Sequence, residues 1–101
     1  MHPSERLKVS NSDVAALCAR YNVRELAVFG SVARGDAGPE SDVDVLVAFQ
    51  DDSNATLFTL IDLQADLEKL FGRAVDLVPK NGLKTALRDE VLAEAQILYA
   101  A

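Results

Sequence analysis

The chain has 101 residues, of which 16 are Asp or Glu, 10 are Lys or Arg and half are hydrophobic, giving a net charge of −6. This length predicts a single domain over residues 1–101, and the balance of apolar and charged residues excludes disordered and fibrous proteins. The sequence pI of about 4.6 argues against a direct grip on nucleic acid, because such a grip needs a basic face.

Neither a membrane span nor a secretory leader is predicted. The longest unbroken apolar run, Val14 to Ala19, has six residues, whereas a span needs about 20. The N-terminal sequence MHPSERLK is polar and holds no apolar leader segment. Cys18 is the single cysteine, so no internal disulfide can form, which fits a reducing compartment. We therefore expect a cytoplasmic protein with no membrane partner, and we expect Cys18 in the core.

The first helix is predicted over residues 11–21. Ser10 is a suitable N-terminal cap, and apolar side chains follow it at the i, i+3, i+4, i+7 spacing of one helix face. These side chains are Val14, Leu17, Cys18 and Tyr21. A short apolar strand is predicted over 25–29, and Gly30-Ser31 breaks it before a helical turn over 32–34.

The rest of the chain alternates strands and helices. Asn54 is expected to cap the helix that Gly72 ends. The other elements expected here are a loop over 35–40, strands over 43–49 and 74–78, and a last helix over about 82–95. The tail over 97–99 can extend that helix or form a strand. This order predicts an α/β domain with a small mixed three-stranded sheet flanked by helices.

Carboxylates occur where an apolar strand has no structural need of them. Asp42 and Asp44 lie at the start of the strand 43–49, and both point to one face because strand side chains alternate. Asp76 interrupts the third predicted strand in the same way. A crossover helix normally makes consecutive strands parallel neighbours, so Asp76 can lie beside Asp44. Three carboxylates on one face predict a site for Mg²⁺ or Mn²⁺.

Gly30-Ser31 predicts a phosphate-binding turn. Glycine lets a ligand approach the backbone closely, free N–H groups attract phosphate, and Ser31 adds a hydroxyl donor. For this turn to meet the acids, the end of the strand 25–29 must lie beside the start of the strand 43–49. The strand 43–49 should then be central, with 25–29 antiparallel on one side and the third strand parallel on the other.

Each of these features alone has an ordinary structural explanation. Gly-Ser is a common turn, Asp-x-Asp can begin a strand, and Asp76 can be an edge residue or an ion-pair residue. The joint pattern is far more specific, because it requires a strand, Gly-Ser, ten residues, Asp-x-Asp entering an apolar strand, a helix, and a further strand that carries an acid.

The segment VFGSVARGDAGPESDVDVLV over residues 28–47 resembles the signature of the DNA polymerase β-like nucleotidyltransferase superfamily, specifically its minimal nucleotidyltransferase (MNT) group. The motif Gly30-Ser31-x10-Asp42-x-Asp44 matches without gaps, and Asp76 matches the third carboxylate. The resemblance covers nearly the whole chain. It implies the polymerase β-like fold and an enzyme that uses two Mg²⁺ or Mn²⁺ ions, with ATP as substrate.

The resemblance also implies roles for individual residues. Asp42 and Asp44 would bind two metal ions, and Asp76 would bind one of these ions and activate the acceptor hydroxyl. All three would therefore be both catalytic and metal-binding residues.

A nucleotide site is implied at the Gly-Ser turn. Gly30 and Ser31 would hold the triphosphate. Arg34, near the turn, and Lys80, just past the third strand, are further candidates for phosphate contacts, although either can be an ordinary surface charge.

Chains of this kind resemble the antitoxin of HEPN–MNT toxin–antitoxin pairs, in which the MNT protein uses ATP to adenylylate a tyrosine of a HEPN ribonuclease. The resemblance therefore implies a HEPN-type toxin as partner. The acidic pI is compatible with a basic, RNA-cutting partner. A homo-oligomer remains open.

Two other functions also remain open. A binding module could neutralise a partner by masking it, with the site only a remnant, although the complete set of site residues argues against a remnant. A small-molecule nucleotidyltransferase is disfavoured, because nothing in the 101 residues resembles an acceptor domain.

Overall fold

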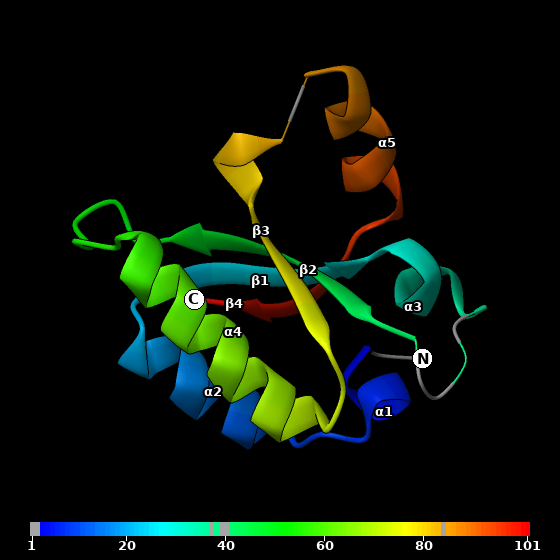
Figure 1. The fold of residues 1–101 in the computed structure, drawn as a ribbon, viewed down its shortest axis with the longest axis horizontal. Coiled ribbons are helices and arrows are strands. Elements are labelled where there is room, and N and C mark those ends of the chain that lie inside the picture. The colour runs from blue at the N-terminus through cyan, green and yellow to red at the C-terminus, as the bar shows by residue number, and fades with distance from the viewer. Residues whose placement is uncertain (1–2, 37, 39–40, 84) are drawn as a thin grey trace.

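The structure is a computed structural model that describes residues 3–36, 38, 41–83 and 85–101 (Figure 1). The helices are α1 (Pro3–Leu7), α2 (Asn11–Arg20), α3 (Gly30–Arg34), α4 (Leu57–Phe71) and α5 (Thr85–Glu94). The strands are β1 (Val23–Phe29), β2 (Val43–Phe49), β3 (Val75–Pro79) and β4 (Gln96–Ala100), and a 3-10 turn, η1, covers Lys80–Gly82. Part of the loop expected over 35–40 lies outside the described residues.

One sheet has the strand order β3-β2-β1-β4. Strand β2 pairs with β1 antiparallel and with β3 parallel, which confirms the predicted arrangement around the strand 43–49. The tail that could be helix or strand is β4, which pairs antiparallel with the outer edge of β1. The sheet therefore has four strands rather than three, because β1 has a free edge and β4 buries Leu98 against the core.

Helices α2 and α4 pack on one face of the sheet, where alternate residues of β2, such as Val43, Val45 and Val47, are buried (Figure 1). Cys18 of α2 is fully buried in this core, as expected. The opposite face of β2 carries Asp44, and α5 lies across the sheet from α2 and α4 (Figure 1). The period of two in β2 thus separates a structural face from a face that bears a carboxylate.

Two helix starts differ in how well they were predicted. Ser10 caps α2, and its hydroxyl accepts from the N–H groups of Ser12 and Asp13 at 3.1 and 3.4 Å. Asn54 was the wrong cap for α4, because Thr56 caps this helix. Thr56 and Thr59 bond reciprocally through side chain and backbone, at 3.1 and 3.4 Å. Asn54 has no such partner three residues later, so the helix begins at the position where two N–H groups are satisfied.

The ends of the chain hold two further differences. Helix α1 was not predicted, and α5 is shorter than the expected 82–95, because Lys80–Gly82 form a 3-10 turn instead. Within the described part of the chain, no helix is long and apolar enough to span a bilayer.

Candidate active site

The three predicted acids lie on one face at one end of the sheet. Asp44 of β2 is directly opposite Asp76 of β3 in the parallel register. Asp42 comes two residues before Asp44 and therefore lies on the same face. Asp44 is half-buried, whereas Asp42 and Asp76 are exposed. The structure thus brings the three carboxylates to one region and leaves two of them open to solvent.

Electrostatics also couples these acids. Burial raises the pKa of Asp44 above its usual value, and the negative charges of Asp76 and then Asp42 raise it further. Arg34 acts in the opposite direction, by the smaller effect of its positive charge. A carboxylate that is hard to ionise beside two others is a place where a divalent cation would relieve repulsion.

Gly30 lies against Asp44. Phe29, the last residue of β1, is opposite Asp44 in the antiparallel register, so the chain turns into α3 beside that carboxylate. Gly30 has φ 70°, and a Cβ atom at this position would collide with Oδ2 of Asp44. Both the left-handed backbone and the close approach require glycine here. The predicted contact between the Gly-Ser turn and the acids is therefore present.

Helix α3 carries the remaining predicted residues. Ser31 is half-buried, and its hydroxyl bonds to no other residue that the structure describes. Arg34 is exposed and forms ion pairs with Asp36 at 3.3 Å and Glu94 at 3.2 Å. Glu94 also accepts from the backbone N–H of Gly30 at 3.0 Å. Nothing in the local sequence marked Glu94 as part of this region, since it lies at the far end of a polar helix.

Two arginines that sequence patterns did not single out fix the backbone around the site. Arg6 donates from Nη1 to the carbonyl oxygens of Val32 and Ala33, at 2.9 and 2.7 Å, at the C-terminal end of α3. Arg73 donates to the carbonyl oxygen of Ser41 from Nε at 3.0 Å and from Nη2 at 2.6 Å. One arginine therefore holds the helix that follows Gly30, and the other holds the residue just before Asp42.

Strand β3, which carries Asp76, is held at its outer edge by α4. The N–H of Val75 donates to Glu68 Oε2 at 2.9 Å, and the N–H of Leu77 donates to Gln64 Oε1 at 3.2 Å. These bonds satisfy edge N–H groups that would otherwise be free to pair with another strand. The position of Asp76 is thus fixed by β2 on one side and α4 on the other.

The donor chemistry of the three acids fits a divalent cation, because Mg²⁺ and Mn²⁺ prefer carboxylate oxygens. Among the described residues, no group of three His, Cys, Asp or Glu side chains is placed closely enough to hold a metal ion. The register nevertheless puts Asp44 and Asp76 directly opposite each other on neighbouring strands.

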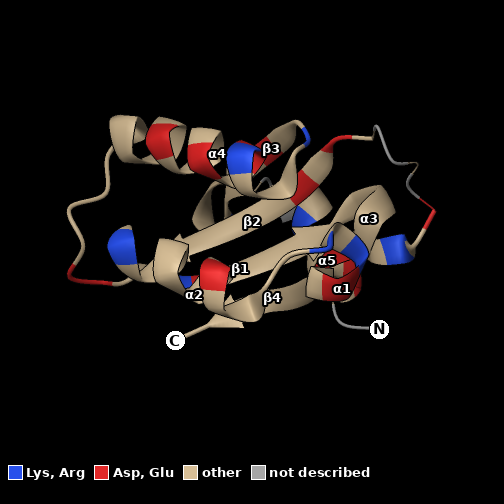
Figure 2. Ribbon diagram, turned by 90° about the horizontal axis from the view of Figure 1, so that it is seen from below, with Lys and Arg blue, Asp and Glu red and all other residues tan. Residues whose placement is uncertain are grey.

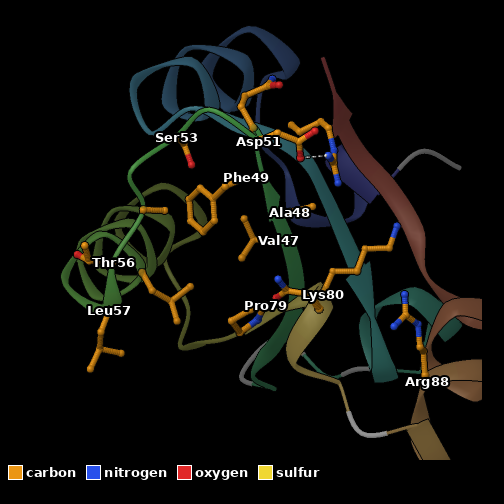
Figure 3. Close-up of a pocket in the computed structure, with 15 residues that line it drawn as sticks. Val47, Ala48, Phe49, Asp51, Ser53, Thr56, Leu57, Pro79, Lys80 and Arg88 are labelled. Carbon is orange, nitrogen blue, oxygen red and sulfur yellow. Dashed lines mark hydrogen bonds and ion pairs between the residues drawn. The ribbon is translucent and has the colours of Figure 1, made fainter.

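A cavity of about 760 Å³ opens near the other end of β2 (Figure 3). Val47, Ala48 and Phe49 line it, together with the start of α4 and with Lys80. Lys80 pairs with Glu25 at 2.9 Å and lies four residues past Asp76, which is roughly 13 Å along a strand. The structure therefore does not bring Lys80 to the Gly-Ser turn, where Arg34 lies.

Comparison with known families agrees with this geometry. The family described as "Nucleotidyltransferase domain" matches residues 14–98. The chain therefore belongs to the nucleotidyltransferase domain family, and it is a nucleotidyltransferase.

Individual relatives show which nucleotidyltransferases this chain resembles. Protein adenylyltransferase MntA of Thermococcus cleftensis is 47% identical over 75 residues, which is 74% of each chain. A solved structure of a candidate minimal nucleotidyltransferase is 44% identical, with a TM-score of 0.75 over 94% of both chains. A crystal structure of a toxin–antitoxin with AMP-PNP has a TM-score of 0.74 at 21% identity, over 92% of this chain and 75% of that one, and shows the same fold.

Proposed function

We propose that this protein transfers AMP from ATP to a tyrosine hydroxyl of a HEPN-type toxin, with divalent metal ions, and so acts as an antitoxin. The observation that carries the proposal is the position of Asp42, Asp44 and Asp76 on one sheet face, with Gly30 against Asp44. These acids form no ion pair with another described residue, and such acids next to a glycine turn suit a nucleoside triphosphate bound with metal ions. ATP is then the substrate, and the metal ions are Mg²⁺ or Mn²⁺.

The reaction would form one bond and break another at the α-phosphorus. The acceptor hydroxyl oxygen attacks this phosphorus, and the bond from it to the bridging oxygen of pyrophosphate breaks. Asp42, Asp44 and Asp76 would hold two ions, which supply charge neutralisation for the triphosphate and the leaving pyrophosphate. Asp76 would take the proton of the incoming hydroxyl, because it is exposed on the adjacent strand, away from the turn.

The nucleotide would bind at the turn between β1 and α3. The amide N–H of Gly30 and the hydroxyl of Ser31 are donors at the edge of the carboxylate face. Arg34, one turn further along α3, adds a positive charge for the phosphates. Arg6 and Arg73 would act as positioning residues, because they hold backbone carbonyls of α3 and of the segment before Asp42.

The choice of acceptor is supported by the relative from Thermococcus cleftensis, whose name is protein adenylyltransferase and whose identity to this chain is 47%. The HEPN partner is supported by the resemblance of the Gly30–Asp44 motif to that of MNT antitoxins. The toxin–antitoxin structure with AMP-PNP, which has the same fold, supports an antitoxin role and an adenine nucleotide as ligand.

A label-transfer assay tests the proposal. The protein is incubated with Mg²⁺, a HEPN-type toxin, and ATP labelled at either the α- or the γ-phosphate. Label should reach the HEPN protein from α-labelled ATP alone, and EDTA should stop the transfer. Transfer from γ-labelled ATP would indicate a kinase instead, and transfer in EDTA would contradict the metal site.

Masking of the toxin is a second candidate, favoured by one observation. The first two turns of α4 expose Leu57, Phe58 and Ile61, whose exposed fractions are 68%, 75% and 53%. Acidic residues lie nearby in the sequence, and a basic partner would complement them. If masking dominates, Asp42→Asn/Asp44→Asn should still neutralise the toxin in cells, whereas Phe58→Asp should not.

A further inference from the structure

The carboxylate of Glu94, at the C-terminal end of α5, contacts two of the groups assigned to nucleotide binding. Its Oε1 accepts from the backbone N–H of Gly30 at 3.0 Å. Nη1 of Arg34 donates to the same oxygen at 3.4 Å and to Oε2 at 3.2 Å. Helix α5 lies next to α3 in both ribbon views, and the two helices are in contact (Figures 1 and 2).

The Gly30 N–H and the Arg34 guanidinium are also hydrogen-bond donors that can bind phosphate oxygens. A backbone N–H and a guanidinium bind carboxylate and phosphate in the same way, because both ligands are oxygen anions. Gly30 has one N–H, so it cannot serve Glu94 and a phosphate fully at the same time. A carboxylate left in this place would also repel the triphosphate.

We propose that Glu94 is an internal anion that occupies the phosphate donors of the nucleotide-free protein, and that the triphosphate of ATP displaces it. This inference rests on the proposed function, since it assigns Gly30 and Arg34 to the nucleotide. Glu94 thereby sets the apparent affinity for ATP: the binding energy of the triphosphate is reduced by the contacts that Glu94 gives up.

Displacement needs a movement of one side chain rather than of the helix. The side chain of Glu94 is one-third exposed, so solvent is open to it. The chain just after it is anchored, because Nε2 of Gln96 donates to the carbonyl oxygen of Ala33 at 3.0 Å. Glu94 can therefore turn outward while β4 stays paired with β1.

The electrostatics of the region point the same way. Glu94 is among the charges that raise the pKa of Asp44, so a fourth carboxylate lies close to the three predicted metal ligands. Its departure would lower the negative potential where a metal–ATP complex enters. The alternative is a permanent role, in which Glu94 keeps Arg34 oriented while the nucleotide is bound.

Calorimetric titration of the Glu94→Gln variant distinguishes these two roles. The probes are ATP–Mg²⁺ and inorganic tripolyphosphate–Mg²⁺, which lacks the nucleoside. Displacement predicts that both probes bind to Glu94→Gln about threefold to tenfold more tightly than to the wild type. The reason is that the neutral amide competes less well than the carboxylate for the donors of a partly exposed site. Glu94→Ala should show at least the same gain, because no acceptor remains at the position.

Glu90→Gln is the matched control. Glu90 lies one turn earlier on α5, is exposed, and forms no ion pair with another described residue, so its substitution removes one charge without touching Gly30 or Arg34. The affinity of Glu90→Gln for both probes should stay close to that of the wild type. An equal gain in Glu90→Gln would reduce the effect to net charge and overturn the inference.

Two further outcomes distinguish a failure of the Glu94 displacement from a failure of the proposed function. If the wild type binds ATP–Mg²⁺ but Glu94→Gln and Glu94→Ala bind it equally or more weakly, the displacement role is wrong and the proposed function stands. If the wild type binds neither probe, both fail. Melting temperatures of the variants establish that each is folded.

Discussion

The two ends of strand β2 differ in how their charges are balanced. Near its C-terminal end, where the cavity opens, two of the three cations that line the wall are paired. Lys80 pairs with Glu25 at 2.9 Å and Arg24 pairs with Asp51 at 3.1 Å. This end keeps little free charge for a ligand, and its ion pairs join strands and loops.

The N-terminal end is the opposite case. Asp42, Asp44 and Asp76 form no ion pair with any residue that the structure describes. Arg34, the nearby cation, pairs with Asp36 and Glu94 instead. Carboxylates without a cationic partner on a sheet cost stability, so the difference between the two ends supports our proposal that a divalent cation binds at the acidic end. The cavity and the three acids therefore lie at opposite ends of β2.

The largest expected effect belongs to Asp76→Asn. If Asp76 holds a metal ion and takes the acceptor proton, the change should lower AMP transfer by roughly 10²–10⁴-fold. Binding of ATP–Mg²⁺ should be largely kept, because Gly30, Ser31 and Asp44 are unchanged. The rate is measured with α-labelled ATP and the affinity by calorimetry.

Stability provides the second readout for Asp76→Asn. Removing one of three neighbouring carboxylates relieves repulsion, so the metal-free melting temperature should hold or rise. A structural ion pair with Lys69 or Arg73 would give a lower melting temperature and surviving transfer. The structure argues against that alternative, because the guanidinium of Arg73 bonds to the carbonyl oxygens of Ser41 and Gly38. Retained transfer would remove Asp76 from the catalytic residues.

The next effect compares two glycines with the same backbone. Gly30 and Gly72 have φ 70° and 67°, but a Cβ at Gly30 would meet Asp44, whereas a Cβ at Gly72 would meet nothing within 4 Å. Gly72→Ala should cost only left-handed strain, about 1–2 kcal/mol. Gly30→Ala should cost more and should also weaken ATP–Mg²⁺ binding, as measured by denaturant unfolding and calorimetry. If the two variants lost equal amounts of unfolding free energy and bound ATP–Mg²⁺ with equal affinity, the close approach of Gly30 to Asp44 would have no role in nucleotide binding.

Titration of Asp44 gives a smaller effect with a definite sign. The pKa of Asp44 is raised in the folded state, so the protonated form of this side chain stabilises the fold. This contribution to stability is fully present below the unfolded pKa of about 3.9, and it is lost as the pH rises through the folded pKa. Asp44→Asn cannot ionise and should melt at a higher temperature than the wild type at pH 7 without metal. This gain should disappear as the pH falls below about 4.

The paired end of the molecule supplies the control for Asp44→Asn. Asp51 is an exposed acid that pairs with Arg24, so Asp51→Asn should bring no gain at pH 7. Adding Mg²⁺ should raise the melting temperature of the wild type and not that of Asp44→Asn, because only the wild type keeps the full set of oxygen ligands. A gain of equal size in both variants would assign the effect to net charge.

Local patterns were enough to predict most of the fold and the acids. The β-branched-rich run over 43–49 predicted β2, and the alternation of strand side chains predicted the shared face of Asp42 and Asp44. The crossover rule put Asp76 beside Asp44. The Gly-Ser turn then required an antiparallel β1, as observed. The family resemblance added the roles of these residues, which no pattern alone supplies.

Contacts between distant segments could not be predicted. Arg6, Arg73 and Glu94 act through partners that lie 26 to 64 residues away in the sequence. Each is an ordinary charged residue in its own neighbourhood, and only packing brings it to the site. The same holds for β4, where a short apolar tail becomes a strand because β1 has an open edge.

The smallest expected effect tests the cavity end directly. Lys80→Met keeps the apolar part of the side chain but breaks the ion pair with Glu25. The side chains of Lys80 and Glu25 are 31% and 28% exposed. Partly exposed pairs contribute about 1 kcal/mol or less, so unfolding should become easier by no more than that. The affinity for ATP–Mg²⁺ should be unchanged, whereas Arg34→Met should weaken it, because Arg34 lies beside Gly30 and Lys80 does not. If Lys80→Met weakened ATP binding as much as Arg34→Met, the triphosphate would reach the cavity, and the contrast between a paired structural end and an unpaired catalytic end would fail.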